Sequence, residues 1–323
     1  MTAEMKRIGV LTSGGDAPGM NAAIRAVTRS AIYNGLEVVG IRRGFEGLLE
    51  GDVIPLTSRS VGGIIHRGGT VLRTARSERF KKPEGQVEAL DRLKELDLDG
   101  LILIGGEGTF KGAWALYKKG FPVVGIPGTI DNDIAGTDVT IGFDTAVNTA
   151  LDAVRKLRDT ASSHDRLFIV EVMGREAGFL AVQVALASGA ECVLVPEIEV
   201  DMDKLCEKLH YARRRGKTHS LIIVAEGAMG AQDLAVRLKD TAGYEARVTV
   251  LGHIQRGGSP TAFDAVLASR MGVCAVEALL EGKDGVMTAV QKDEMATPPL
   301  SVAWEEKKPL SADLLSLMDK LSI

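Results

Sequence analysis

The sequence has few cysteines and no long apolar run. Its three cysteines, Cys192, Cys206 and Cys274, stand at neither metal-ligand nor redox spacing, which argues against a disulfide framework and a zinc site. A sparse, odd set of cysteines is typical of reduced thiols in a cytosol. No apolar run approaches the ~20 residues that a membrane-spanning helix needs. The charged pair Lys6-Arg7 precedes the first expected strand, without the pattern of a secretion signal. A cytoplasmic protein is therefore expected.

The sequence also lacks a strong excess of charge of either sign. A net charge of −4 over 323 residues provides neither a basic face for nucleic acid nor a polybasic segment for a membrane surface. The apolar content of 45% is ordinary for a globular protein. At ~150 residues per domain, the length indicates about two domains. Partners other than nucleic acid and membranes are therefore expected.

Strand-like and helix-like runs alternate along the chain. This alternation is the signature of an α/β fold in which a mostly parallel sheet carries helices on both faces. The sequence predicts two Rossmann-like lobes, over residues 1–138 and 139–255. Residues 256–305 are a candidate segment for packing back on the first lobe, and residues 306–323 are expected to hold a C-terminal helix. A long helix is predicted over residues 138–159.

One stretch, Pro127-Gly128-Thr129-Ile130-Asp131-Asn132-Asp133, concentrates reactive groups at the end of an expected strand. It follows the apolar run 121–126, which is typical of a buried parallel strand. Ligands of open α/β sheets bind outside the carboxyl ends of the strands. One carboxylate would accept a proton from an attacking hydroxyl, and another would help to place a hard cation through water. The alternative is a surface loop of turn-forming Asp and Asn residues.

Three glycine-rich turns are candidates for phosphate binding. Residues 14–19 and 105–109 each lie between an expected strand and an expected helix, where backbone amides and a helix N-terminus favour an anion. Residues 67–76 form the third turn, in which Arg76 would reach a transferring phosphoryl group. The first turn matches neither the Walker pattern nor the dinucleotide pattern GxGxxG. Purely structural turns and a solvated arginine remain the alternatives.

The second of these turns contains an acid. A carboxylate at Glu107 would repel a bound phosphate unless a magnesium ion bridged the two, and Thr109 offers a hydroxyl to the same anion. The alternative is that Glu107 only favours the first turn of the following helix.

Arginines and acids also stand at strand ends in the second expected lobe. Arg166 precedes a strand that ends at residues 171–175, and Glu226 follows the next strand. Arg247 starts a strand that ends at residues 252–258. Arginines at such positions suit multidentate phosphate recognition, although a single one is usually a surface ion pair. The histidine in 252–258 has no partner at metal-ligand spacing, so a metal role is not expected.

Five motifs together resemble those of one family. They are Gly14 to Asn21, Gly105 to Thr109, Pro127 to Asp133, Glu171 to Arg175 and Gly252 to Gly258. In order and spacing they are similar to the motifs of bacterial ATP-dependent 6-phosphofructokinases, from Lys6 to about Leu280. The resemblance implies that ATP phosphorylates the 1-hydroxyl of fructose 6-phosphate with Mg²⁺, the committed step of glycolysis. It also implies that the first lobe binds ATP and the second binds the sugar phosphate.

The resemblance further implies a role for each motif residue. Asp131 would be the general base for the sugar hydroxyl, and Asp133 its partner acid. The implied catalytic set is Asp131, Thr129, Asp133, Arg175, Arg76 and Gly15. The implied ATP-binding set is Gly15, Phe45, Arg76, Ser77, Gly106, Glu107, Gly108 and Thr109, with Glu107 as the metal ligand. The implied substrate-binding set is Thr129, Ile130, Asp131, Arg166, Met173, Gly174, Arg175, Glu226, Arg247, His253 and Arg256.

The same resemblance implies a homotetramer with shared active sites. Arg166 and Arg247 match the arginines that the family lends across a subunit interface. The family binds ADP as activator and phosphoenolpyruvate as inhibitor at a second site. The implied effector residues are Arg25, Arg29, Ser58, Arg59, Arg158, Glu191, Arg215, Lys217 and His219. Ser58 stands where the family has an arginine, with Arg59 beside it.

Two positions bear on alternative functions. Pyrophosphate-using relatives carry Asp and Lys at the places held by Gly108 and Gly128, so the two glycines favour ATP as the donor. Glu107 stands where Asp is commonest, which moves the carboxylate by one methylene relative to a metal with strict geometry. A catalytically silent, effector-binding subunit is therefore the third alternative, and the intact Asp131 and Asp133 oppose it.

Overall fold

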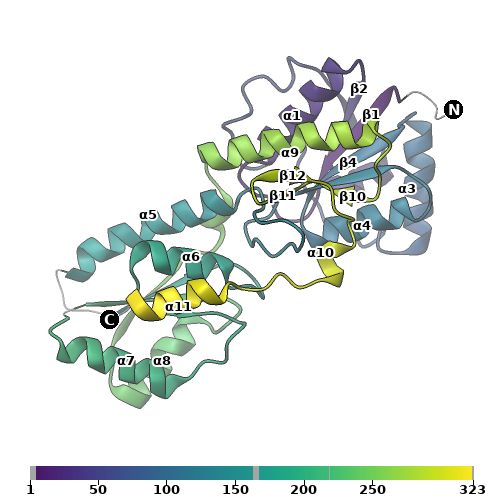
Figure 1. Cartoon of the computed structure of the whole chain (residues 1–323). Coiled ribbons are helices and arrows are strands. Elements are labelled where there is room, and N and C mark those ends of the chain that lie inside the picture. Colours follow the sequence, from purple (N-terminus) through teal and green to yellow (C-terminus); the bar gives the residue numbers. More distant parts are fainter. Residues whose placement is uncertain (1–4, 163–166, 218, 322–323) are drawn as a thin grey trace. The chain divides into compact units, whose positions relative to one another are not determined.

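The chain forms two compact α/β units in this computed structural model (Figure 1), which describes residues 5–162, 167–217 and 219–321. The first unit comprises Met1–Thr129, Ile134–Asp144 and Arg256–Lys308. The second comprises Ile130–Asp133, Thr145–Gln255 and Pro309–Ile323. Each unit therefore joins segments that are distant in sequence. None of the helices in the described residues combines the length and apolar character required to span a bilayer.

The first unit is built on a six-stranded sheet of order β10-β5-β4-β1-β2-β3. The strands are β1 (Arg7–Thr12), β2 (Glu37–Ile41), β3 (Val53–Leu56), β4 (Gly100–Gly105), β5 (Val123–Pro127) and β10 (Val286–Met287). Neighbouring strands run parallel except for β2 and β3, which are antiparallel. The central strand β4 is buried along its whole length, as expected for a parallel strand covered on both faces.

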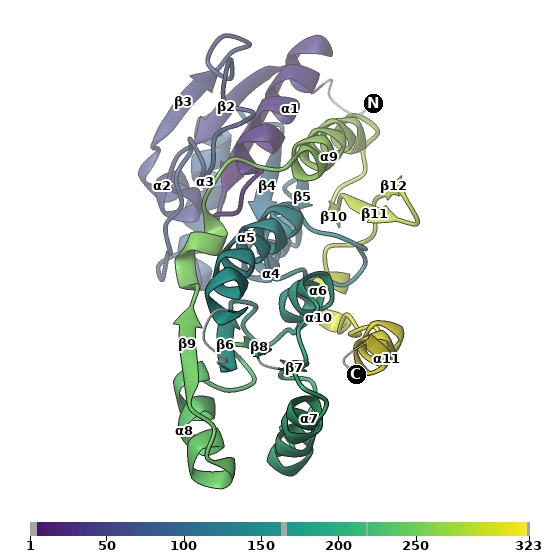
Figure 2. The same cartoon turned by 90° about the vertical axis from the view of Figure 1, so that its left-hand side faces the viewer.

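Helices cover both faces of this sheet (Figure 2). On one face, α1 (Met20–Tyr33) and α9 (Ala262–Leu280) pack side by side. On the other face, α2 (Gly44–Glu50), α3 (Pro83–Glu95) and α4 (Glu107–Tyr117) form an apolar core with the sheet. The short helix α10 (Val302–Glu305) contacts α4, and β11 (Ala289–Gln291) pairs with β12 (Glu294–Ala296). Helices on both faces of a mostly parallel sheet confirm the predicted fold class.

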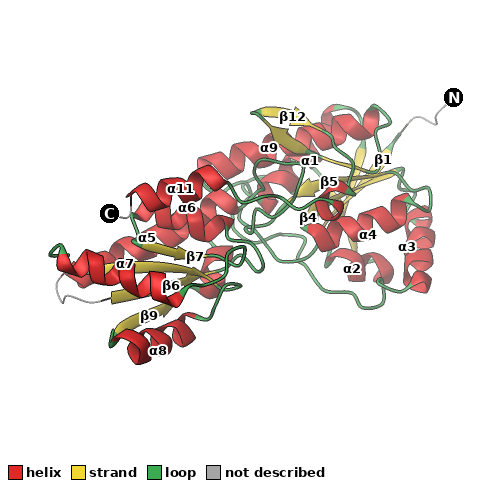
Figure 3. Cartoon of the chain, turned by 60° about the horizontal axis from the view of Figure 1, so that its bottom comes forward, coloured by secondary structure: helices red, strands yellow, loops and turns green. Residues whose placement is uncertain are grey.

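The second unit has a four-stranded, all-parallel sheet of order β7-β8-β6-β9 (Figure 3). The strands are β6 (Leu167–Val172), β7 (Cys192–Leu194), β8 (Ser220–Ala225) and β9 (Ala246–Val250). Apolar residues of α7 (Met202–Arg214) and α8 (Ala231–Ala242) form a core against one face. The helix α6 (Phe179–Ser188) packs on β7 and β8, and α11 (Ala312–Leu321) packs on α6. The remaining elements are α5 (Phe143–Ser162) and the 3₁₀ helix η1 (Gly252–Arg256).

The strand orders place the candidate residues at points where ligands bind. In the first unit the chain moves from β1 to β2 on one side and to β4 and β5 on the other, so β1 and β4 flank a topological switch point. In the second unit, β6 and β9 flank the corresponding point. Crevices at the carboxyl ends of such strand pairs are the usual ligand sites of open α/β sheets.

The predicted helix over residues 138–159 is wrong at its start. Residues before α5 are held in other pairings: Asp138 N donates to Val290 O at 2.8 Å, and Ile141 N donates to Pro127 O at 3.0 Å. Gly142 then has φ of 102°, which no helical residue adopts. The helix begins at Phe143, after this glycine.

Several other elements were not predicted, including α2, α8, β3, β12 and α10. The helices α2 and α8 and the antiparallel strand β3 lie in segments read as loops or left unassigned. In α8, the apolar residues at 231, 234 and 238 have helical spacing. Gly243 ends the helix in a left-handed conformation. The sequence therefore contained both a periodicity and a stop signal for this helix.

The three cysteines are free thiols. Burial raises the pKa of Cys192 to about 12, and burial also raises the pKa of Cys206 and Cys274. A thiol with a raised pKa stays protonated at neutral pH, which makes it a poor nucleophile.

The packing of α1 on α9 depends on small residues. A Cβ atom at Gly272 would lie 2.6 Å from Ala26 Cβ and 3.1 Å from Ala23 O. We expect Gly272→Leu to force these helices apart and to reduce the free energy of unfolding by about 1–3 kcal/mol. Val273→Leu on the exposed side of α9 is the matched control, and it should leave the thermal midpoint unchanged. Equal midpoints for both variants would contradict the close helix contact.

Candidate functional site

The turns after β1 and β4 meet at the switch point of the first unit. Ser13 N donates a hydrogen bond to Ile104 O at 3.0 Å, which joins the two strand ends. A Cβ atom at Gly105 would lie 2.5 Å from Ser13 O and would overlap the Thr109 hydroxyl. Only glycine therefore lets the turns approach this closely. Gly105 is a structural requirement that the predicted residue sets omit, although it stands inside the glycine motif.

Thr109 directs a polar group into this junction. Its side chain is buried, and its hydroxyl lies 3.5 Å from the position of a Cβ atom at Gly14. Within the described residues the hydroxyl has no hydrogen-bond partner. Buried hydroxyls are normally satisfied, so this group suits a ligand that would accept or donate a hydrogen bond beside the two glycine turns.

The side chain of Arg256 packs against the first glycine turn, residues 14–19. Its Nη1 donates to Asp16 O at 3.1 Å and is only 2.5 Å from where a Cβ atom at Gly15 would stand. The residue is buried, with 9% of its surface exposed. The resemblance assigns Arg256 to the sugar phosphate and Gly15 to ATP. The structure brings these two residues together in the first unit.

Glu107 begins α4, where the helix N-terminus favours negative charge. Its carboxylate forms an ion pair with Lys111, one helical turn later, and both side chains are about half exposed. The described residues contain no group of three or more His, Cys, Asp or Glu side chains that would bind a metal ion. A metal at Glu107 would therefore take most of its ligands from phosphate and water, as Mg²⁺ commonly does.

Phe45 lies in a rigid aromatic layer. It stacks on Phe80 with ring centroids 4.0 Å apart and an interplanar angle of 18°. A Cβ atom at Gly112 would lie 2.7 Å from Phe45 Cε2, so α4 supports the ring directly. Ser77 is buried, and its hydroxyl accepts a hydrogen bond from Phe80 N at 3.1 Å. Ser77 thus fixes the turn that carries the second ring.

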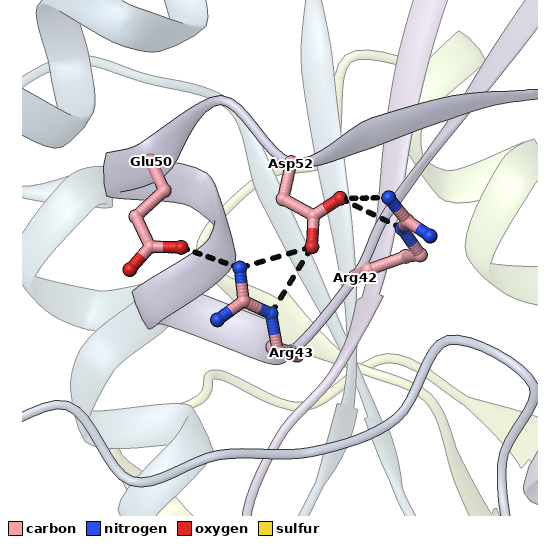
Figure 4. Close-up of polar contacts among 4 residues, drawn as sticks. All are labelled: Arg42, Arg43, Glu50 and Asp52. Carbon is pink, nitrogen blue, oxygen red and sulfur yellow. Dashed lines mark hydrogen bonds and ion pairs between the residues drawn. The ribbon is translucent and has the colours of Figure 1, made fainter.

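An ionic network holds the start of α2, which carries Phe45 (Figure 4). Arg43 has φ of 59°, an unusual conformation for a residue other than glycine. Asp52 accepts a hydrogen bond from Arg42 Nε at 2.7 Å and one from Arg43 Nε at 3.1 Å, and Arg43 also pairs with Glu50. Desolvation alone would raise the pKa of Asp52. The hydrogen bonds and charges of Arg42 and Arg43 together lower it by more, so the pKa of Asp52 lies below its usual range.

The second unit brings Asp131 and Arg175 together. The carboxylate of Asp131 has 3% of its surface exposed, and its Oδ2 lies 3.5 Å from Arg175 Nε. The arginine side chain is 63% exposed. A buried carboxylate in contact with an exposed cation is positioned to act on a ligand that the cation binds.

Glu226 is joined to the same turn. Its Oε1 accepts hydrogen bonds from Gly174 N at 3.3 Å and from Arg175 N at 3.0 Å. Met173 is buried behind this turn. The predicted substrate residues 173–175 and Glu226 therefore form one cluster at the ends of β6 and β8.

The other predicted substrate and ATP residues are placed as follows. Arg247 is exposed on β9, His253 is exposed on η1, and Arg76 is exposed in the loop after residue 70. Gly108 is exposed, and Thr129 belongs to the first unit, where its carbonyl accepts from Thr140 Oγ1 at 2.6 Å. Arg166 lies outside the described residues.

Part of the predicted effector set forms a cluster in the second unit. Arg158 Nη2 donates to Gly189 O at 2.6 Å, and Lys217 Nζ lies 2.5 Å from the buried carboxylate of Glu191. Arg215 lies over the ring of Tyr211, with its Cζ 5.6 Å from the ring centroid. The remaining predicted effector residues are His219 beside β8, and Arg25, Arg29, Ser58 and Arg59 in the first unit.

Comparison with known proteins gives consistent matches over nearly the whole chain. Residues 7–279 match the family model described as phosphofructokinase. The chain is 54% identical over 319 residues to a Halalkalibacterium halodurans protein named ATP-dependent 6-phosphofructokinase. It is 56% identical over 319 residues to a Listeria monocytogenes protein of the same name. Both alignments cover 99% of this chain and 100% of the relative.

Solved structures show the same similarity. Phosphofructokinase from Saccharomyces cerevisiae matches with a TM-score of 0.87 and 35% identity, over 93% of this chain and 45% of the yeast chain. A pyrophosphate-dependent phosphofructokinase from Marinobacter aquaeolei matches with a TM-score of 0.84 and 23% identity, over 98% of this chain and 91% of that chain. The second likeness concerns the fold alone.

The network around Asp52 should make stability depend on pH. A carboxyl whose pKa is depressed in the folded state stabilises the protein above its unfolded pKa of about 3.9, and that contribution is lost as the pH falls through the folded value. We expect Asp52→Asn to lower the thermal midpoint at pH 7. The difference from the wild type should shrink as the pH falls below about 3.9. A difference that is independent of pH would show that the ionised carboxylate is not responsible.

Proposed function

The chain belongs to the phosphofructokinase family, and from this membership we propose how its residues carry out the reaction. The protein is an ATP-dependent phosphotransferase with an alcohol acceptor. It transfers the γ-phosphoryl group of ATP to the 1-hydroxyl of fructose 6-phosphate, giving fructose 1,6-bisphosphate and ADP. The structural observation that best supports a chemical role is the buried Asp131 carboxylate in contact with Arg175.

Asp131 is proposed as the general base. Phosphoryl transfer requires mainly positioning and charge stabilisation, and the base removes the proton of the attacking hydroxyl. The low exposure of the carboxylate shields it from water, and its contact with Arg175 places it beside a cation that would bind a phosphoryl oxygen. Asp133 is the proposed partner acid. Thr129 is proposed to orient the transferring phosphate.

Arg175, Arg76 and Gly15 are proposed to stabilise the transferring phosphoryl group. The exposed guanidinium groups of Arg175 and Arg76 provide charge for its oxygens. Gly15 allows close approach of the backbone. Because Arg256 lies on Gly15, we assign its guanidinium to anionic oxygens near this turn as well as to the sugar phosphate.

Kinases of this family need a divalent metal, and we propose Mg²⁺ at Glu107. When bound, the ion would neutralise charge on the ATP phosphates. One exposed carboxylate beside a glycine turn fits an ion that keeps most of its ligands from phosphate and water. The ion pair with Lys111 engages Oε1 of Glu107, which leaves Oε2 for the metal or a water bound to it.

The choice of ATP over pyrophosphate is supported at Gly108. A Cβ atom at this residue would meet no other atom within 4 Å, so the space beside it suits a nucleoside. A Cβ atom at Gly128 would instead lie 3.1 Å from Ile104 and 3.3 Å from Met20. A lysine there, as in pyrophosphate-using relatives, would require these side chains to move.

We also propose a cytoplasmic homotetramer under effector control. Arg166 and Arg247 are proposed to reach the active site of a neighbouring subunit. ADP and phosphoenolpyruvate are the proposed effectors. The cluster of Arg158, Glu191 and Lys217 supports an anion site in the second unit, because a buried acid holds the lysine in place.

Turnover with two donors tests the proposed function. We expect the native chain to phosphorylate fructose 6-phosphate with ATP and Mg²⁺, and to use pyrophosphate poorly. Asp131→Ser should lower kcat by about 10²–10⁴-fold, the range for loss of a general base. Asp240→Ser, an exposed change on α8, is the control. A native chain inactive with both donors would favour the silent-subunit alternative.

Glu107 variants test the metal assignment. We expect Glu107→Asp to keep kcat within about tenfold, and Glu107→Gln to weaken metal affinity by about 10–100-fold. Lys111→Met releases the Glu107 carboxylate from its ion pair and should not weaken the affinity for Mg²⁺. The measurement is kcat against free Mg²⁺ concentration. Unchanged metal dependence in Glu107→Gln would remove this residue from the metal site.

A further inference from the structure

Arg175 is held in an unfavourable backbone conformation. Its φ is 52°, and the preceding Gly174 has φ of 143°. Residues other than glycine rarely adopt positive φ, and they keep it only when their surroundings enforce it. The turn is closed by Ala177 N, which donates to Gly174 O at 2.9 Å. The contacts that enforce this turn therefore decide where the Arg175 side chain points.

Two neighbouring residues at the end of β8, Glu226 and Gly227, enforce the positive φ of Arg175. Glu226 N donates to Val172 O at 2.9 Å, which extends the pairing of β8 with β6 by one step. This brings Glu226 Oε1 to the amides of Gly174 and Arg175, at 3.3 and 3.0 Å. The Glu226 carboxylate thus stabilises the strained turn at residues 174–175 through charge-assisted hydrogen bonds to both amides.

Gly227 provides the second contact. A Cβ atom at Gly227 would overlap Arg175 O and lie 2.9 Å from Arg175 C. The backbone of Arg175 therefore packs against the Cα of Gly227. Any residue other than glycine at this position would collide with the carbonyl of Arg175. Gly227 belongs to none of the predicted site residues.

We propose that Gly227 is a positioning residue for phosphoryl transfer, which acts through Arg175 together with Glu226. The close backbone contact keeps Arg175 in its left-handed conformation, with Nε 3.5 Å from Asp131 Oδ2. Any side chain at residue 227 displaces the carbonyl of Arg175 and turns the guanidinium away from the general base. This inference rests on the proposed function, because it assigns Gly227 to the chemistry of Arg175 and Asp131.

Gly227→Ala and a nearby control variant test the proposal. A misplacement of about 1 Å in an active-site group costs about 10²-fold in rate, so we expect Gly227→Ala to lower kcat by about that factor with KM for ATP unchanged. Gly230→Ala is the matched control three residues later. Gly230 has φ of −63°, and its Cβ would meet only the flexible Asp233 carboxylate at 3.3 Å. Wild-type kcat in Gly227→Ala would overturn the proposal.

A double-mutant cycle separates positioning from general destabilisation. If Gly227 acts through Arg175, adding Gly227→Ala to Arg175→Ala should cause no further loss of kcat. Additive losses would mean that Gly227 has only a structural role. Glu226→Ala removes the acceptor of both amides without adding bulk, and its kcat loss should likewise disappear in the Arg175→Ala background. If Gly227→Ala does not fold, this second variant still tests whether the turn acts through Arg175, because additive losses with Arg175→Ala would overturn that inference.

A crystal structure of Gly227→Ala keeps the inference distinct from the proposed function. We expect Arg175 to leave the left-handed region and its Nε to move away from Asp131. An unchanged Arg175 would overturn the inference even if the wild type is active. A wild type that does not phosphorylate fructose 6-phosphate would refute the proposed function, while this structure would still decide the role of Gly227 in the turn.

Discussion

The structure depends on the close approach of backbone segments at the carboxyl ends of parallel strands. In the first unit, the pairing of β1 with β4 brings Ser13 O onto Gly105, where any side chain would collide. In the second unit, the pairing of β6 with β8 brings Arg175 O onto Gly227 in the same manner. Parallel pairing aligns the strand ends, and glycine then allows the following turns to touch.

These backbone contacts fix the turns that carry or bind charged side chains. Arg256 lies on the Gly15 turn, and Arg175 lies beside Asp131 because a strained turn is held by Glu226. Arg256 Nη1 donates to the backbone carbonyl of Asp16, and Glu226 accepts from the backbone amide of Arg175. Less conformational entropy is then lost when an anion binds, which favours tight and correctly oriented binding.

A second kind of support comes from ion pairs around Phe45 and around the predicted effector residues. Asp52 joins Arg42 and Arg43 at the start of α2, the helix that carries Phe45. The buried Glu191 pairs with Lys217, and Arg158 donates a hydrogen bond to Gly189 O. Glu191 and Asp131 are buried acids paired with more exposed bases, and breaking such a pair leaves a desolvated charge.

The sequence by itself determined the fold class, the family and the motifs at strand ends, because alternating apolar runs and glycine turns are local signals. It missed the start of α5, since residues 138–142 are held by strands distant in sequence and Gly142 cannot be helical there. Only the tertiary structure decided that Arg256 lies on Gly15, that Lys111 pairs with Glu107 and that Gly227 supports Arg175. The contacts of Arg256 and Gly227 join residues far apart in the chain, and no periodicity in the sequence records which strand ends will touch. Even the local pairing of Lys111 with Glu107 is a choice among partners that only the folded chain makes.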